Sequence, residues 1–326
     1  MISDDPLLQD LLTRISNGLT QKLLGHSGIL APIFLLSTTL IAFLIWRARK
    51  PGTGFLRWAF PREIWGHPSH RTDIKVFLFS GVVTTCVSLV SVGLATKLGT
   101  WASSLVGTWV GYGPTPSALS HPVILAVAVF LILDLCAYWS HRLTHDWAVL
   151  WPFHETHHSA EVMTPITVYR RHPVDDLFLQ AFNWIGTGLV LGVALGVSVG
   201  AVSAAILGGV SLAYFVFNLI GANLRHSHVW LSYGPVLEHI FISPAQHQVH
   251  HSCDPRHHDR NYGQVLAIWD WMFGTLYVPQ GHEELTFGLA DARGARLAQP
   301  HGGLRRFLIE PFRGSLRAIR RRLGRP

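Results

Sequence analysis

The chain has 326 residues, of which 49% are hydrophobic and only 14% are charged, and its formal net charge is +7. Soluble domains carry roughly 25% charged residues, so this composition argues against an ordinary soluble domain and indicates a membrane protein. The basic residues lie in short segments between apolar stretches, which is typical of a cytosolic membrane face rather than a nucleic-acid groove. We therefore expect no nucleic-acid partner. The three cysteines form no CxxC pair, which argues against a disulfide framework or a cysteine zinc site.

Three single apolar spans are predicted first along the chain. Residues 28–46 and 76–96 are each long enough to cross a hydrocarbon core of roughly 30 Å. Residues 121–140 form the third span, which is apolar except for Asp134 near its end. The acidic N-terminus lacks a small-residue cleavage site after the first span, so we expect that span to be retained.

A longer uncharged stretch follows at residues 177–224. One helix of this length would measure about 72 Å, more than twice the thickness of the membrane core. We therefore predict a hairpin of two helices that is broken near 196–200, with 208–209 as the less favoured break. The sequence thus predicts about five transmembrane helices in an all-α integral membrane protein.

Basic loops fix the expected orientation, because they remain on the cytosolic side. This rule places the loop 47–75, the segment 141–176 and everything after 222 in the cytosol, with the N-terminus outside. The uncharged stretch 98–120, which is rich in aromatic residues, is then an outer interfacial loop. In the tail, residues 304–325 have apolar residues on one helical face and arginines elsewhere, which predicts a basic amphipathic helix on an anionic leaflet. A solvated tail is the alternative.

These segments divide the chain into three expected parts. Residues 1–120 are an N-terminal membrane region with two spans and the outer loop. Residues 121–280 form a second domain, which holds the other spans and a cytosolic, helical, histidine-rich metal-binding cap, and residues 281–326 are a basic cytosolic tail. Abundant Ala, Gly, Leu and Arg favour a bacterial inner membrane, although an endoplasmic reticulum protein would show the same topology.

Histidines carry the chemistry: the chain has 20, most of them between residues 141 and 258. Three motifs stand out, HxxxH at 141–145 and HxxHH at 154–158 and 247–251. Helical residues three or four apart share a face, so each motif presents two or three imidazoles to one point. Eight imidazoles are too many for one ion and fit two adjacent ions, whereas a structural zinc would use four ligands. The eight predicted ligands are His141, His145, His154, His157, His158, His247, His250 and His251.

Two more histidines follow the last predicted span, in the sequence Asn-Leu-Arg-His-Ser-His. His226 and His228 are two residues apart, so they do not share a helical face. We expect one to bind metal and the other to support it, with His226 the favoured ligand. His228 stays a candidate for either role.

Three further residues are candidates for catalytic or supporting roles. Asp134 lies seven residues before His141, on the same helical face, and is expected to accept the N–H of a ligating imidazole. A helix–helix hydrogen bond is the alternative. Glu155 could serve the same purpose or form a solvent-facing salt bridge. His172, directly before a proline, is either a supporting residue or part of a loop.

The order of these motifs and their flanks resembles the fatty acid hydroxylase / sterol desaturase superfamily, from about residue 123 to 278. The resemblance implies an O2-dependent, non-haem di-iron enzyme with a helical membrane fold and a cytosolic cap over a lipid-facing opening. The sterol-desaturase-like and alkylglycerol-monooxygenase-like branch is the most similar, and that branch often has another residue at the position of His228. The carriers are Asp134, 138–145 (YWSHRLTH), 153–159 (FHETHHS), 169–173 (YRRHP), 243–244 (SP), 247–251 (HQVHH), 261–263 (NYG), 269–270 (WD) and 273–275 (FGT).

The combined prediction is a membrane enzyme with two irons that hydroxylates a lipid C–H bond with O2. Its substrate could be a sterol, fatty acyl, carotenoid, ether or amino lipid, and desaturation on the same site is the alternative. Zinc could replace iron on purification. The chain lacks a dinucleotide-binding motif and cluster-binding cysteines, so a separate ferredoxin, cytochrome b5-like protein or reductase is expected on the basic face.

Two rival functions use histidines as well. A metal transporter needs ligands near the membrane midplane, whereas these motifs lie at the ends of spans. A catalytic zinc hydrolase uses three protein ligands and an open position, which eight imidazoles overfill.

Overall fold

The computed structural model describes residues 30–110, 122–198 and 204–324, together with isolated positions before residue 30. All regular elements in these residues are helices, and β pairing among them is limited to three isolated bridges. The predicted all-helical fold is confirmed for the described part of the chain.

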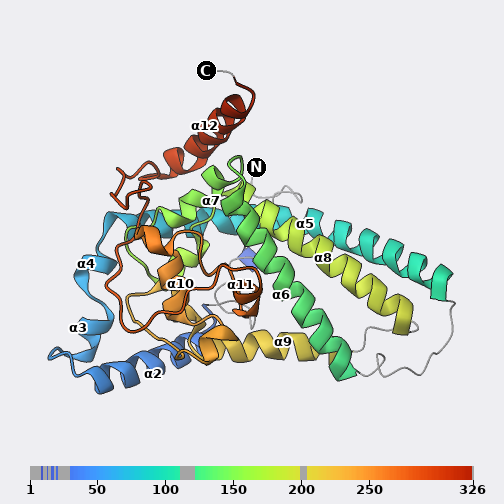
Figure 1. Cartoon of the computed structure of the whole chain (residues 1–326), viewed down its shortest axis with the longest axis horizontal. Coiled ribbons are helices and arrows are strands. Elements are labelled where there is room, and N and C mark those ends of the chain that lie inside the picture. The colour runs from blue at the N-terminus through green and yellow to red at the C-terminus, as the bar shows by residue number, and fades with distance from the viewer. Residues whose placement is uncertain are drawn as a thin grey trace.

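Long helices extend from a compact part that contains α7, α10 and α11 (Figure 1). Among them, α8 packs along α5 and α6, and α9 packs on α6 and α2. The long helices are α2 (Pro32–Arg49), α5 (Pro68–Val110), α6 (Pro122–Asp146), α8 (Pro173–Ser198) and α9 (Ala204–Leu219). The shorter ones are α3 (Phe55–Ala59), α4 (Arg62–Trp65), α7 (Trp151–His158), α10 (Pro244–His250) and α11 (Ile268–Met272), and α12 (Leu304–Arg322) projects near the C-terminus. Short 3₁₀ turns are η2 (Pro165–Tyr169), η3 (Ala222–His226), η4 (Leu237–His239) and η5 (Pro255–His257).

Two helices among the described residues are long and apolar enough to cross a membrane, Pro32–Arg49 and Val123–Asp146. They coincide with the first and third predicted spans. The uncharged stretch is divided between two helices, as predicted, because α8 ends at Ser198 and α9 begins at Ala204. The less favoured break at 208–209 is inside α9, and residues 199–203 lie outside the described residues. The number of five spans and their orientation stay predictions.

The predicted outer loop at 98–120 is wrong for its first part. Helix α5 continues to Val110, so Trp101 and Trp109 lie on a helix rather than in a loop. Close packing against α8 explains the difference: a Cβ atom on Gly192 would meet the carbonyl oxygen of Gly99. Contact between two backbones supports α5 beyond the point at which its sequence alone indicates an end. The rest of the predicted loop, residues 111–120, lies outside the described residues.

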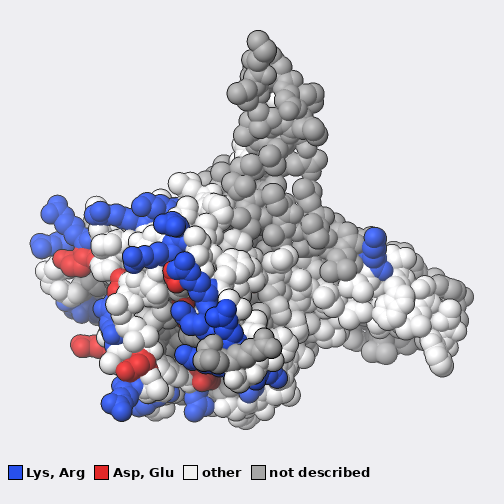
Figure 2. All heavy atoms as spheres, turned by 90° about the horizontal axis from the view of Figure 1, so that it is seen from above, with Lys and Arg blue, Asp and Glu red and all other residues white. Residues whose placement is uncertain are grey.

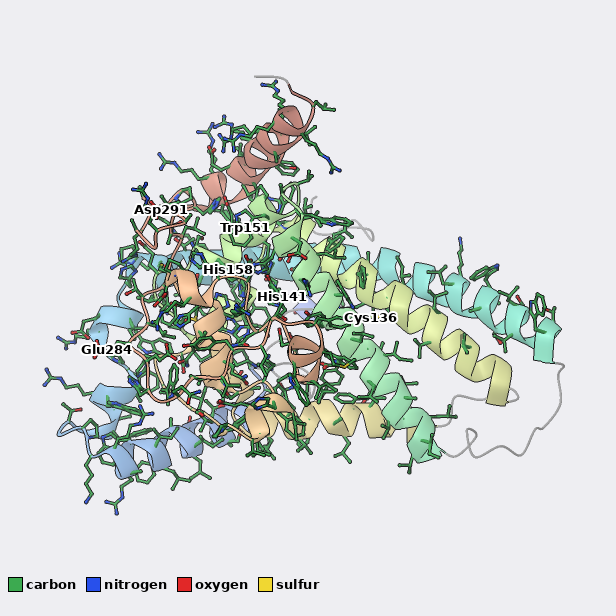
Figure 3. The ribbon with its side chains drawn as sticks, in the orientation of Figure 1. Cys136, His141, Trp151, His158, Glu284 and Asp291 are labelled. Atoms are coloured by element: carbon green, nitrogen blue, oxygen red, sulfur yellow. The ribbon has the colours of Figure 1, made fainter. Side chains whose placement is uncertain are left out.

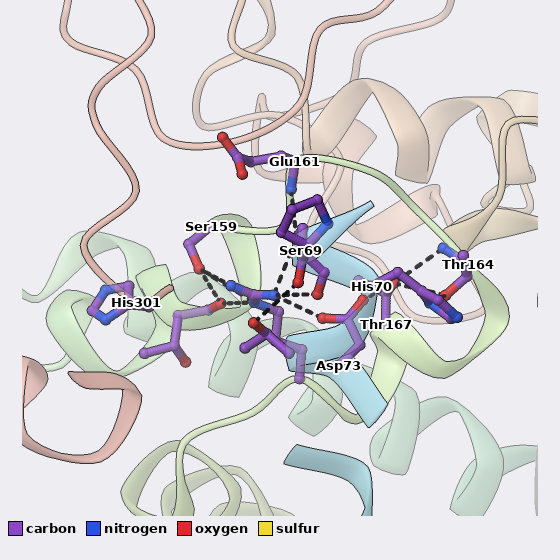
Figure 4. Close-up of polar contacts among 12 residues, drawn as sticks. Ser69, His70, Asp73, Ser159, Glu161, Thr164, Thr167 and His301 are labelled. Carbon is purple, nitrogen blue, oxygen red and sulfur yellow. Dashed lines mark hydrogen bonds and ion pairs between the residues drawn. The ribbon is translucent and has the colours of Figure 1, made fainter. Parts of the chain in front are cut away.

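A buried ion pair fixes the compact part to α5 (Figure 4). Arg170 and Asp73 have fully buried side chains, and their Nη1 and Oδ1 atoms are 2.8 Å apart. The Arg170 Nε–H donates to the carbonyl oxygen of Thr156 on α7, at 2.9 Å, and its guanidinium also contacts the hydroxyl groups of Ser69 and Ser159. A buried charge is tolerated only when it is paired and hydrogen-bonded, so these contacts hold α7 in one position against α5.

Candidate metal centre

The structure brings nine histidines together in two adjacent groups. The five-histidine group collects residues from α6, α7 and α10, and the four-histidine group collects residues from α7, α10 and η3. Within each group, one nitrogen from every ring lies within 4.8 Å of those of the others. Figure 3 shows His141 and His158 in the interior of the compact part. The five-histidine group is His141, His145, His154, His158 and His250, and the four-histidine group is His157, His226, His247 and His251.

Hydrogen bonds from the protein orient the rings of the five-histidine group. The Nδ1 atom of His141 lies 2.9 Å from the carbonyl oxygen of Tyr262, and that of His250 lies 2.7 Å from the carbonyl oxygen of Arg260. His154 Nδ1 lies 3.1 Å from the carboxylate of Asp175. A carbonyl or carboxylate at Nδ1 keeps the proton there, which leaves the Nε2 lone pair free to bind a metal.

The inward nitrogens of this group have no protein partner among the described residues. These are the buried Nε2 atoms of His145, His154, His158 and His250. Buried polar atoms are almost always hydrogen-bonded, so four orphaned nitrogens that converge on one point require an explanation. A bound metal ion would satisfy all of them, because imidazole is a good ligand for Fe, Zn, Cu and Ni.

In the four-histidine group the rings meet nitrogen to nitrogen. His226 Nε2 lies 3.3 Å from His157 Nε2 and 3.1 Å from His247 Nε2, and His247 Nε2 lies 3.3 Å from His251 Nε2. Two nitrogens bound at about 2.1 Å to one ion lie about 3.0–3.4 Å apart for ligand angles of about 90–109°. The observed spacings match this range, so the residues fit a metal ion.

The two groups adjoin. The rings of His158 and His251, one from each group, stack with their centroids 4.4 Å apart, and those of His250 and His251, also one from each group, are 5.3 Å apart. Adjacent residues of the α7 motif serve different groups, because His157 belongs to the four-histidine group and His158 to the five-histidine group. The arrangement therefore suits a pair of neighbouring ions rather than two separate sites.

Burial favours the neutral form of His158, His250 and His251. Loss of solvent, followed by repulsion between neighbouring histidines, places the pKa of His158 and that of His251 well below the usual value of 6.5. Burial also lowers the pKa of His250 to about 3, although its bond to the Arg260 carbonyl opposes the shift. Only the neutral ring has a free lone pair, so the protein environment prepares these side chains for metal at neutral pH.

A cavity of about 290 Å³ opens beside the five-histidine group. Its lining includes His145, His158 and His250 together with Trp151 and Asp291. In Figure 3, Trp151 and Asp291 lie above His158, toward the end of the compact part from which α12 projects. A small molecule can therefore reach the five-histidine group without passing through the long helices.

The expected role of Asp134 is wrong. Its carboxylate accepts hydrogen bonds from the backbone N–H groups of Val265 and Leu266, at 3.1 and 3.0 Å, and from the indole of Trp269, at 3.0 Å. It therefore bonds to segment 265–269 rather than to a histidine of either group, and it clamps that segment onto α6. The helical spacing to His141 is real, but the Tyr262 carbonyl, three residues before this clamp, occupies the position at His141 Nδ1.

The remaining candidates lie outside the two groups. Glu155 is 25% exposed, and its Oε1 accepts from Nε2 of the buried His301 ring at 3.2 Å, so its partner is a histidine outside both groups. His172 places Nε2 3.2 Å from the carbonyl oxygen of Leu308 in α12 and packs between aromatic rings. His228 Nε2 lies 2.9 Å from the carbonyl oxygen of Trp58. His226 is thus the histidine of its pair that the structure brings to the centre.

Sequence reasoning missed the residues that orient the rings. Asp175 is 2% exposed and bonds to His154, but it lies 21 positions away along the chain. Its one sequence signal is its place in the first turn of α8, two residues after Pro173. The carbonyl groups of Arg260 and Tyr262 leave no side-chain signal, although a left-handed Asn261 between them marks an unusual turn.

With this geometry in place, comparison with known proteins shows which family the histidine-rich segment resembles. Residues 126–275 match the family model described as fatty acid hydroxylase. This segment contains all nine clustered histidines. The match confirms, for residues 126–275, the resemblance drawn from the histidine motifs.

The curated relatives are proteins named for acting on lipids. The chain is 33% identical to ornithine lipid hydroxylase OlsE of Rhizobium tropici over 235 residues, 68% of this chain and 65% of that protein. It is 34% identical to alkylglycerol monooxygenase of Xenopus tropicalis over 160 residues, 49% of this chain and 32% of that protein. It is 25% identical to lathosterol oxidase of Mus musculus over 171 residues, 52% of this chain and 51% of that protein. The chain thus spans only about a third to two thirds of these relatives. No solved structure matches it significantly.

Proposed function

We propose that this chain is a membrane-bound, O2-dependent hydroxylase that oxidises a lipid C–H bond with one iron in each histidine group. The observation that carries the proposal is the pair of adjacent, buried histidine groups. In one group four Nε2 atoms have no protein partner among the described residues, and in the other the Nε2 atoms approach one another at 3.1–3.3 Å. The match of residues 126–275 to the fatty acid hydroxylase model and the names of the relatives support an oxidoreductase acting on lipids. The proposed ligands are the eight histidines of the three motifs together with His226.

A bound iron pair would supply the two-electron chemistry that activates O2. The chain's own residues prepare that step by orienting the rings, by holding protons at Nδ1 and by limiting the access of water. Asp175 and the carbonyl groups of Arg260 and Tyr262 hold protons at Nδ1, so the opposite nitrogens stay available. The buried ion pair of Arg170 and Asp73 fixes α7, which carries three of the ligands. Burial of the rings limits the access of bulk water.

The substrate is proposed to be a membrane lipid with a polar head group. Relatives carry names for an ornithine lipid, alkylglycerols and sterols, all of which are amphipathic. Desaturation is the second candidate, because a relative from Leptosphaeria maculans is named delta(7)-sterol 5(6)-desaturase and is 27% identical over 146 residues. We propose a separate ferredoxin, cytochrome b5-like protein or reductase as electron donor, and a bacterial inner membrane as location, with the metal centre in the cytosol.

The test compares lipids from cells that express the chain or its His250→Ala variant, grown with ¹⁶O2 or ¹⁸O2. His282→Ala is the matched control, because that ring packs on Trp230 outside both groups. We expect a lipid that appears only with the wild type and the control and that carries one heavy oxygen. Iron in the purified wild type should approach two per chain.

Other outcomes have defined meanings. A product that has lost two hydrogens and gained no oxygen would support the desaturase. Identical lipids in the presence of confirmed iron would point to a substrate or donor that the host lacks, and addition of lipid extracts from other sources would then be the next experiment. Identical lipids with no bound iron would overturn the oxygenase proposal.

A further inference from the structure

Helix α12 (Leu304–Arg322) has one side that belongs to the compact part. Phe307, Pro311 and Ser315 are buried and lie four residues apart, which places them on one helical face. The face packs on the back of α7, because α7 and α12 are in contact and a Cβ atom on Gly314 would lie 2.8 Å from Pro152. Phe153 on α7 meets the first exposed ring of α12, Phe312, at 5.1 Å between centroids. This face therefore packs α12 against α7.

A second face of α12 is apolar and open. Phe312, Leu316, Ile319 and Leu323 are spaced by four, three and four residues, so they form one stripe along the helix. Their exposed fractions are 54%, 49%, 39% and 64%. A continuous stripe of large exposed side chains marks an interaction surface, unlike a single exposed leucine.

Arginines occupy the face beside this stripe. The helix contains seven arginines and one glutamate, and all seven arginines are exposed. Arg313, Arg317 and Arg320 follow the same spacing as the apolar stripe, one residue later in the chain. In the view from the side on which α12 projects, Figure 2 shows Lys and Arg side chains gathered over this part of the molecule with few acidic ones.

We propose that α12 is a docking surface for an anionic lipid bilayer. An apolar stripe flanked by arginines is the pattern of a helix that lies in the headgroup region, with its apolar side chains inserted and its cations on the lipid phosphates. Charge complementarity selects this occupant: a second copy would bring seven more arginines against these seven. Long arginine side chains also extend past the apolar stripe to the headgroup level.

This docking surface is connected to the metal centre through contacts on the opposite side. The backbone carbonyl of Leu308 lies 3.2 Å from His172 Nε2, and His172 contacts Phe153 on α7. Just before α12, His301 bonds to Glu155, which lies between the ligands His154 and His157. A bilayer that holds α12 therefore also holds the back of the helix that carries three ligands. Whether the enzyme hydroxylates or desaturates its substrate does not affect this surface.

Spin labels in the full-length protein provide the test. In a background with the three cysteines replaced by serine, single cysteines are placed at Leu316 in the stripe, at Arg317 on the arginine face and at Ser315 on the buried face. Each protein is reconstituted into vesicles of phosphatidylcholine alone or with phosphatidylglycerol. Electron paramagnetic resonance then measures collisions of each label with O2, which enters the bilayer, and with a water-soluble nickel complex.

We expect the ratio of O2 to nickel accessibility to be several-fold higher at Leu316→Cys than at Arg317→Cys in anionic vesicles. The Ser315→Cys label should be shielded from both reagents. Replacement of Arg313, Arg317 and Arg320 by Gln should lower the ratio at position 316. The matched control replaces Arg62, Arg256 and Arg293, three exposed arginines elsewhere, and should leave the ratio unchanged.

Three results would overturn the proposal. A label at position 316 that collides freely with nickel in anionic vesicles would show a solvated helix. A label shielded from both reagents would show that protein covers the stripe. Equal ratios of O2 to nickel accessibility at position 316 in neutral and anionic vesicles would show that the helix inserts without recognising lipid charge. Circular dichroism of each variant confirms that a changed ratio does not come from loss of the helices.

Discussion

The two histidine groups differ in what holds their rings. In the five-histidine group, three rings bond through Nδ1 to Asp175 or to backbone carbonyls of residues 260 and 262. In the four-histidine group, the Nδ1 atoms of His157, His247 and His251 are buried, and no described residue bonds to them. The first group is therefore oriented by the protein before metal arrives, whereas the second has its rings packed against one another.

This difference predicts unequal affinities. Partners at Nδ1 raise ligand basicity and fix the ring, and they remove part of the entropic cost of binding. The five-histidine group should bind its ion more tightly, and the ion of the four-histidine group should leave first under a chelator. Four predictions test this comparison.

Loss of a ligand should have the largest effect. His250→Ala removes a ring from the five-histidine group. Loss of a residue that hydrogen-bonds to a metal ligand typically lowers activity by about 10–100-fold, and loss of the ligand itself should lower product formation by more. His247→Ala should abolish product equally but leave one ion bound, because the better-oriented group is intact. Elemental analysis of the two purified variants measures the difference. Equal metal loss in both variants would show that the two groups load as one unit.

Removal of the Asp175 carboxylate, which bonds to His154, should have the second-largest effect. Asp175→Ala takes away the acceptor 3.1 Å from Nδ1 and should lower affinity for the ion of the five-histidine group by about 10–100-fold. Asp175→Asn keeps an oxygen there and should recover most of the affinity. Metal titration of the apoprotein gives both values. If the Asp175→Ala and Asp175→Asn variants both bind metal as tightly as the wild type, the carboxylate has no positioning role.

Acid should destabilise the metal-free protein. The folded-state pKa of His250 is about 3, and that of His158 and of His251 also lies well below 6.5, the value expected in the unfolded chain. The unfolded state then binds more protons below about pH 6.5, so stability is lost progressively as pH falls from there toward about 3. Thermal unfolding of the apoprotein between about pH 7.5 and 5 measures this slope. His250→Gln should flatten it, and an unchanged slope in that variant would assign the effect to other groups.

The smallest effect should come from His228→Ala. Its ring bonds to the Trp58 carbonyl and lies outside both groups, so the variant loses one hydrogen bond worth about 1 kcal/mol of unfolding free energy. Metal content should stay the same as in the wild type. A variant that loses one ion would show that His228 reaches the four-histidine group when metal is bound.

Local patterns predicted the helices and motifs well, because both depend on residues near one another in the chain. The HxxHH spacing put imidazoles on one side of α7 and α10, and the uncharged stretch 177–224 broke into α8 and α9 near the expected glycines. Contacts between distant segments were not readable. The division of His157 and His158 between two groups, the bond from Asp175, and the extension of α5 along α8 all depend on tertiary packing. Asp134 was correctly singled out as an unusual buried carboxylate, but its partners lie about 130 residues away.

The clamp that Asp134 makes on residues 265–269 has a consequence for biosynthesis. The ligands span residues 141 to 251, yet the carbonyl groups that orient His141 and His250 belong to residues 262 and 260, just before the clamped segment. A ribosome must therefore translate past residue 269, and the emerging segment must fold back onto α6, before the five-histidine group is complete. More than a hundred codons separate the second histidine motif from residue 269, and the five-histidine group stays incomplete while they are translated. Premature termination anywhere before this segment therefore leaves a five-histidine group without the carbonyl groups that orient His141 and His250.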